Sequence, residues 1–142
     1  MPREKHGELA GRIREEIVRG RFAPGKRLPA RTRLTKRYDV SSATLQLAMH
    51  TLADEGFVTG MERRGTVVAE HPPHLSHYGI LFGHEATPGK PWMRSWQAIA
   101  EAGREILDRR PSRLSFFYVG ERHQSMASYQ AFLDDVAAHR LA

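Results

Sequence analysis

The stretch ARTRLTKRYDVSSATLQLAMHTLADEG, residues 30–56, decides the fold of the first half of the chain. Its apolar residues recur at helical spacing on both sides of a polar turn at 39–41, which predicts two helices joined by three residues. Ser41 is the expected cap of the second helix, because its side chain can accept a bond from a free backbone N–H. Gly56 is expected to end that helix in the left-handed conformation. The residues predicted to face inward are Leu34, Tyr38, Leu45, Ala48, Met49 and Leu52.

The flanking segments predict one more helix and a hairpin. From Glu8 to Arg19, apolar residues recur every fourth position with charged residues between them, which indicates an amphipathic helix. Residues 26–28 lie within a turn rich in Pro and Gly and fit a very short strand. Residues 57–59 and 66–68 are β-prone and are joined by a basic turn, which predicts a hairpin. This order of elements is the layout of a winged helix-turn-helix.

Four segments stand in an order and at spacings that are typical of one family: APGKRLP (23–29), YDVS (38–41), LADEGF (52–57) and RGTVVA (64–69). Together they resemble the DNA-binding domain of the GntR family of bacterial transcription regulators. The resemblance implies an α+β winged helix-turn-helix domain at residues 1–70. It also implies a homodimer that binds a palindromic operator in double-stranded DNA.

The residues expected to contact DNA lie on the second helix, at the start of the third and at the wing tip. Members of the family usually carry arginine where this chain has Thr32 and Ser42, and often where it has Gln46. Neighbouring cations on the second helix are expected to replace the phosphate contacts, because a phosphate needs charge and little geometry. Hydroxyl and amide groups at the start of the third helix are expected to read bases, and a glutamine can bond bidentate to adenine. The predicted DNA-binding residues are Arg31, Arg33, Lys36, Arg37, Ser41, Ser42, Thr44, Gln46, Arg63, Arg64 and Gly65.

The charge of the chain suits a polyanionic partner. Its 142 residues carry 22 Lys and Arg against 16 Asp and Glu, a net charge of +6. Residues 1–70 hold 14 of these cations and nine of the acids, and six cations lie between Lys26 and Arg37 without one acid. Such a run is typical of a nucleic-acid surface, although taken alone it also fits a solvated helix face.

Composition disfavours several other classes of protein. The chain has no cysteine, which excludes disulfides, thiol catalysis and thiolate zinc sites. No apolar run approaches the roughly 18 residues of a membrane span, and no secretory signal is recognisable, so a cytoplasmic protein is expected. No nucleophile and base stand at catalytic spacing, so neither an enzyme nor a cofactor is expected. The loop at 83–90 is a poor phosphate loop, because Pro91 stands where a metal-binding Ser or Thr belongs.

The spacing of apolar residues changes in the second half of the chain. Residues 71–77 contain two prolines, which argue against a helix, and are interpreted as a linker. His71, His74 and His77 recur every third residue, but nothing in the segment supports a metal site. Residues 78–82 and 114–119 fit buried strands, each followed by an amphipathic helix, the first at 91–109. This pattern predicts a partial α/β segment (β-α-β-α) with a parallel sheet at residues 78–142.

This second segment resembles the start of a LacI-type, periplasmic-binding-protein-like sensor domain, which implies a sugar-like effector. The predicted effector-binding residues are Glu85, Trp92 and Arg94, at the carboxyl end of the first strand and the start of the helix. Alternatively, Trp92 and Trp96 only pack at a domain or dimer surface. Two functions therefore stay open: a ligand-responsive transcription regulator, and a DNA-tethering interaction module without a functional sensor.

Overall fold

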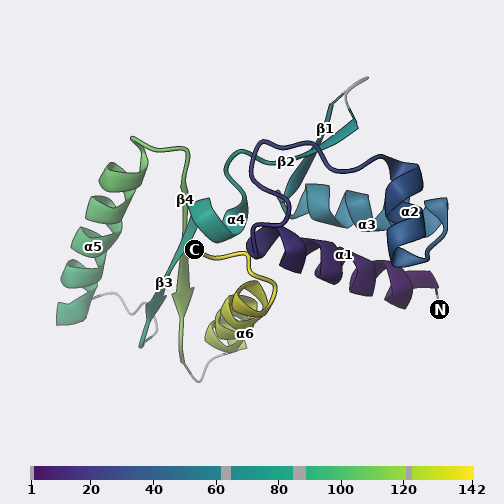
Figure 1. Cartoon of the computed structure of the whole chain (residues 1–142). Helices are drawn as coiled ribbons and strands as arrows, with labels where there is room; N and C mark the ends of the chain where they lie inside the picture. The colour runs from purple at the N-terminus through teal and green to yellow at the C-terminus, as the bar shows by residue number, and fades with distance from the viewer. Residues whose placement is uncertain (1, 62–64, 85–88, 121–122) are drawn as a thin grey trace. The chain divides into compact units, whose positions relative to one another are not determined.

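The computed structural model describes residues 2–61, 65–84, 89–120 and 123–142 (Figure 1). Its chain divides into two units, Met1–Pro73 and His74–Ala142. The first unit contains α1 (Pro2–Val18), α2 (Arg31–Tyr38), α3 (Ser42–Asp54), β1 (Val58–Met61) and β2 (Gly65–Val68). The second contains β3 (His77–Phe82), α5 (Pro91–Leu107), β4 (Arg113–Tyr118) and α6 (His123–Ala137). Between β2 and β3 lies the short helix α4 (Pro73–Ser76).

The first unit is built around one hydrophobic core to which its three helices and its hairpin all contribute. All six residues predicted to face inward from α2 and α3 are buried, so that prediction is confirmed. Helix α1 begins at Pro2, earlier than the predicted Glu8, and buries Leu9, Ile13 and Ile17 against the same core. The inner stripe of α1 therefore holds α3 in place, with the opposite side of α3 left to solvent.

The hairpin of strands β1 and β2 is antiparallel, with Val58 opposite Val68 and Met61 opposite Gly65. Gly56 precedes it with φ +85°, the left-handed conformation predicted for the end of α3. Residues 26–28 form a short extended segment beside β2. Leu28 N–H donates to the Thr66 carbonyl at 2.9 Å, and Val68 N–H donates to the Lys26 carbonyl at 2.9 Å. The predicted short strand thus exists as a single bridge against β2.

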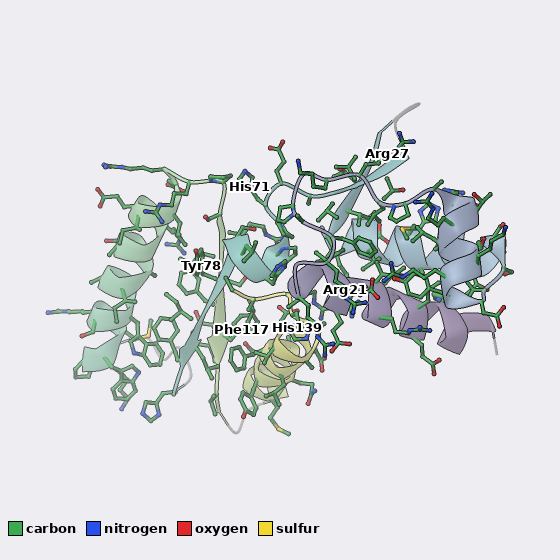
Figure 2. The ribbon with its side chains drawn as sticks, in the orientation of Figure 1. Arg21, Arg27, His71, Tyr78, Phe117 and His139 are labelled. Carbon is green, nitrogen blue, oxygen red and sulfur yellow. The ribbon has the colours of Figure 1, made fainter. Side chains whose placement is uncertain are left out.

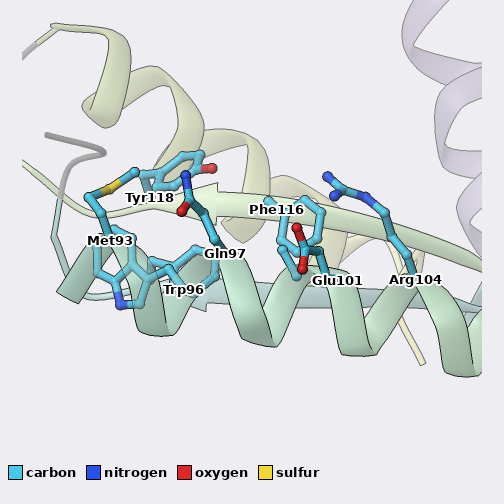
Figure 3. A pocket seen from close by; sticks show the side chains of 9 residues that line it. Met93, Trp96, Gln97, Glu101, Arg104, Phe116 and Tyr118 are labelled. Atoms are coloured by element: carbon cyan, nitrogen blue, oxygen red, sulfur yellow. The ribbon is translucent and has the colours of Figure 1, made fainter. Parts of the chain in front are cut away.

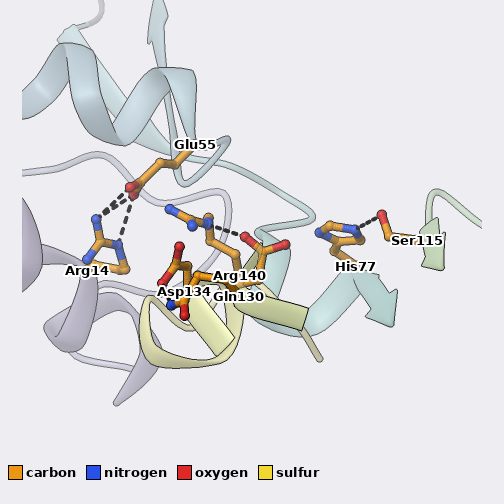
Figure 4. A network of polar contacts seen from close by, with 8 residues as sticks. Arg14, Glu55, His77, Ser115, Gln130, Asp134 and Arg140 are labelled. Atoms are coloured by element: carbon orange, nitrogen blue, oxygen red, sulfur yellow. Dashed lines mark hydrogen bonds and ion pairs between the residues drawn. The ribbon is translucent and has the colours of Figure 1, made fainter. Parts of the chain in front are cut away.

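The expectation of a linker without a helix at 71–77 is wrong in two respects. Pro73 begins α4, which is possible because the first residue of a helix needs no N–H donor. His77 begins β3 and is buried, with its Nε2 atom 2.7 Å from Ser115 Oγ (Figure 4). Burial lowers the pKa of His77. Among the described residues, no three His, Asp or Glu side chains gather as metal ligands.

The second unit is a two-stranded parallel sheet, in which His77 pairs with Arg113 and Phe82 with Tyr118. Its two long helices lie on opposite faces of this sheet (Figure 1). The rings of Phe82 and Trp96 stack at 4.4 Å on the face of α5, and those of Phe117 and Phe132 meet edge-on at 5.4 Å on the face of α6.

This unit buries few apolar side chains. Among its described apolar residues, only Phe82 and Phe117 are buried. The outer stripes of its helices are exposed at Ile99, Ile106, Met126, Tyr129, Leu133 and Val136. Within the described part of the chain, no helix combines the length and the apolar character that a membrane crossing requires.

Candidate nucleic-acid interface

The start of α3 is a capped helix end that faces solvent. Ser41 Oγ accepts a hydrogen bond from Thr44 N–H at 3.1 Å, as the sequence predicts. The Ser41 and Thr44 hydroxyls also lie 2.9 Å apart, so both are engaged in the cap. Because the core takes the opposite side of the helix, Ser42 and Gln46 are exposed. These two side chains are presented on a rigid helix and carry donors and acceptors that suit base edges.

The cationic side chains of α2 differ in whether they form an ion pair with α1. Arg31, Arg33 and Lys36 are exposed. Arg37 instead turns to α1, where its Nη2 atom donates to both carboxylate oxygens of Glu16 at 3.0 and 2.9 Å. Among the described residues, Arg37 is thus the one of the four predicted phosphate contacts on this helix that forms an ion pair with an acid.

Glu16 is the centre of a small network between α1 and α2. The Tyr38 hydroxyl also donates to this carboxylate, at 3.0 Å. Burial and the bond to Glu16 raise the pKa of Tyr38 to about 12. The Arg37 guanidinium lies over the rings of Phe22 and Tyr38, at 5.5 and 5.6 Å. These contacts give Arg37 a structural role that the sequence did not indicate.

A second ion pair fixes the far end of α3. Arg14 on α1 donates to both oxygens of Glu55, at 2.6 to 2.9 Å, and both side chains are largely buried (Figure 4). The Arg14 guanidinium also lies 5.7 Å from the Phe57 ring centre. Since Glu55 directly follows α3, this pair ties the end of the candidate recognition helix to α1.

The hairpin brings in a cation outside the predicted set of DNA-binding residues. Arg27 precedes Leu28, which is buried, and its own side chain is exposed on the row beside β2 (Figure 2). Its Nε and Nη2 atoms would lie 3.2 Å from a Cβ atom at Gly65, which has φ +79°. Alternation along the short strand, with Leu28 inward, was the signal that could have identified Arg27. Arg63 and Arg64, predicted at the wing tip, lie outside the described residues.

A groove separates α3 from the hairpin. We call it the α3–hairpin groove; its volume is about 230 Å³, and it is lined by Arg31, Gln46, Met49, His50, Ala53, Val58, Gly60 and Thr66. His50 lies one turn after Gln46 on α3 and is exposed. Sequence reasoning missed His50 because only the packing of the hairpin against α3 makes its position part of a groove.

The structure describes two of the three predicted effector residues. Glu85 lies outside the described residues. Trp92 lies near His84 and Lys90, at 5.7 Å from each, and its Nε1 atom is buried without a partner within the described structure. Arg94 lines a different groove, with Met93 and Gln97, in which Trp92 takes no part. The reason is geometric, since residues two apart on a helix point to different sides.

Another cavity in the second unit lies between α5 and the sheet. It has a volume of about 190 Å³ and is lined by Phe82, Met93, Trp96, Gln97, Ala100, Glu101, Arg104, Phe116 and Tyr118 (Figure 3). Stacked aromatic rings form its floor, and Glu101 and Arg104 contribute its charged groups. Neither Trp92 nor Arg94 belongs to this lining.

Comparison with known proteins shows that the first unit is similar to bacterial regulatory proteins. Residues 5–68 match the family model described as bacterial regulatory proteins, gntR family. The chain is 35% identical over 63 residues to the mannosyl-D-glycerate transport/metabolism system repressor MngR of Escherichia coli (strain K12), a match covering 44% of this chain and 26% of MngR. It is 34% identical over 77 residues to the uncharacterized HTH-type transcriptional regulator YhdI of Bacillus subtilis (strain 168), covering 54% of this chain and 16% of YhdI.

These matches span about a quarter or less of the length of the two curated relatives. Among solved structures, the AraR DNA-binding domain in complex with operator ORX1 is similar with a TM-score of 0.44 and 26% identity, over 46% of this chain and 78% of that chain.

Proposed function

We propose that residues 5–68, which match the gntR family model, form a winged helix-turn-helix DNA-binding domain of the GntR family, and that the chain is a sequence-specific transcription regulator. The observation that carries the proposal is the surface formed by α2 and the start of α3. There, Ser42 and Gln46 are exposed beside the exposed cations Arg31, Arg33 and Lys36. A surface of this kind can read bases with its neutral groups while its cations hold the phosphates.

In the proposed complex, α3 enters the major groove with its capped end first. Gln46 and Ser42 contact base edges, and a bidentate bond from Gln46 to adenine gives the operator its preference. Ser41 and Thr44 cap the first turn of α3. They contact the DNA only through the hydrogen-bonding groups of their hydroxyls that the cap leaves unused. The hairpin, whose strand β2 begins at Gly65, lies toward the adjacent minor groove, which Arg64 is predicted to contact.

The proposal extends to the assembly and the compartment. A two-fold dimer would bind a palindromic operator with one domain on each half-site. A bacterial regulator that binds the chromosome acts in the cytoplasm, where we place this chain. The matched family model describes regulatory proteins rather than enzymes, which supports a function without catalysis.

The second unit is proposed to be the signal-receiving part, an α/β segment like the start of a LacI-type sensor. Its support is the parallel sheet with helices on both faces. The name of MngR, a repressor of a mannosyl-D-glycerate system, agrees with a sugar-like effector. The alternative function, a DNA-tethering module without a sensor, is favoured by one observation: Trp92 and Arg94 do not line one cavity.

The experiment that tests the proposal is DNA selection followed by titration. The full chain is used to enrich duplexes from a random pool, and binding to the enriched site is measured by fluorescence anisotropy between 50 and 300 mM salt. With about four to six phosphates contacted per domain, the log–log salt slope should be about −4 to −5. A failure to enrich any sequence, or a slope near zero, would overturn the proposed function. Sugars added to the complex then separate a ligand-responsive regulator, whose DNA affinity they change, from a tethering module.

A further inference from the structure

Four of the eight described residues that line the α3–hairpin groove can donate hydrogen bonds, the other four are apolar, and none of the eight is a carboxylate. Arg31 contributes a guanidinium and Thr66 a hydroxyl, whereas the amide of Gln46 is assigned to a base edge in the proposed complex. His50 contributes an imidazole, which carries one N–H when neutral and two when protonated. A groove with several donors and no carboxylate favours an anion.

The position of the groove identifies the anion. On duplex DNA, a major groove and the adjacent minor groove are separated by one sugar-phosphate strand. If α3 occupies the major groove and the hairpin reaches the minor groove, this sugar-phosphate strand of the DNA passes between α3 and the hairpin. The α3–hairpin groove of the protein lies at that position. The phosphodiester group of DNA is therefore the anion that the geometry brings to these donors.

We propose that the α3–hairpin groove holds a phosphodiester of this intervening strand, and that His50 is a DNA contact whose strength depends on protonation of its imidazole. The inference rests on the proposed function, because it requires that α3 and the hairpin straddle one strand. It adds a specific residue, and a pH response, to a surface otherwise made of permanently charged cations.

The groups around His50 determine which other side chains could contribute to a change of DNA affinity with pH. On α2, the guanidinium of Arg31 lines the groove. On α3, Asp54 follows His50 by one turn. The hairpin contributes Val58, Gly60 and Thr66, which do not titrate. Histidine is the side chain whose ordinary titration falls between pH 5 and 8.

The sign of the effect follows from linkage. A phosphate beside His50 favours the protonated imidazole, so DNA binding is strongest at low pH and weakens as the pH rises past the titration of the bound form. One additional phosphate contact steepens the salt slope by about 0.9, which corresponds to roughly fivefold tighter binding at 0.15 M salt. Because a phosphate carries no sequence information, the gain should be equal on the preferred site and on random duplex.

The test measures anisotropy titrations of the full chain between pH 6 and 8 at 0.15 M salt, with the enriched duplex and with a random one. The variants are His50→Gln, which cannot be protonated, and His50→Arg, which keeps the charge at every pH. His84→Gln, in the second unit, is the matched control. Thermal melts of each variant verify folding, which the exposed position of His50 should allow.

We expect the wild type and His84→Gln to gain about fivefold in affinity from pH 8 to pH 6. His50→Gln should lose that gain, and His50→Arg should bind at pH 8 as tightly as the wild type binds at pH 6. A pH response that survives in His50→Gln, or a gain seen only on the preferred site, would overturn the inference while leaving the proposed function intact. Absence of DNA binding at every pH would instead overturn the proposed function.

Discussion

Arg33 and Arg37 stand one turn apart on α2 and carry the same charge, yet the structure gives their removal opposite consequences. The Arg33 side chain is exposed, so Arg33→Ala should remove one phosphate contact and nothing else. The salt slope should become shallower by about 0.9, and affinity at 0.15 M salt should fall roughly fivefold on every duplex. The melting temperature should stay within the small range typical of surface substitutions.

Arg37→Ala should do the reverse. It removes the two bonds to Glu16 and the contacts over Phe22 and Tyr38. The Arg37 side chain is 40% exposed, and Tyr38 still donates to Glu16 in the variant, so solvent screening should reduce the loss to about 1 kcal/mol, below the usual range for hydrogen bonds to charged groups. In a domain of this size that lowers the melting temperature by about 4–8 °C.

Differential scanning calorimetry and anisotropy titrations of the two variants, side by side, measure both quantities. The reasoning fails if Arg37→Ala makes the salt slope shallower as much as Arg33→Ala does without lowering the melting temperature. Such a result would mean that Arg37 is released from Glu16 to bind phosphate, as the sequence alone predicts.

Three further outcomes are expected. Gln46→Ala should cost about 1–3 kcal/mol on the preferred duplex and much less on random DNA in competition titrations, and equal losses would show that Gln46 does not read a base. Leu45→Ala should lower the free energy of unfolding in urea by about 2–5 kcal/mol because Leu45 is 1% exposed. Leu47→Ala, on the same helix and 46% exposed, should change the unfolding free energy by about 0.5 kcal/mol or less, and similar losses for both would contradict the assigned face of α3. The exposed apolar stripes of α5 and α6 should cause self-association in sedimentation velocity, or weak amide protection in hydrogen exchange; a compact, protected monomer would contradict this expectation.

The sequence predicted the first unit well because its core follows from local periodicity. The stripe of Leu45, Ala48, Met49 and Leu52 can lie on only one side of a helix, and the turn at 39–41 leaves little choice of connection. The cap at Ser41 and the left-handed Gly56 are also local features. The same reasoning located β3, α5 and β4 to within two residues at each end.

What the sequence could not predict depends on partners distant in the chain. Glu16 is 21 residues from Arg37, and no periodic pattern connects them. His50 became a candidate contact only through the position of the hairpin. The helix at Pro73 was missed because proline was treated as a breaker, although it fits the first turn.

The pairing of residues 26–28 with β2 also constrains how the domain folds. The bridge between Arg27 and Val67 closes a loop of forty residues that contains α2, α3 and β1. Closing a flexible loop of that length costs about 3 kcal/mol of chain entropy, which two or three hydrogen bonds cannot offset by themselves. The wing should therefore dock late, after the two helices inside the loop have packed and shortened the distance between its ends. Once docked, the amide protons of Leu28 and Val68 should exchange with solvent only when the domain unfolds as a whole.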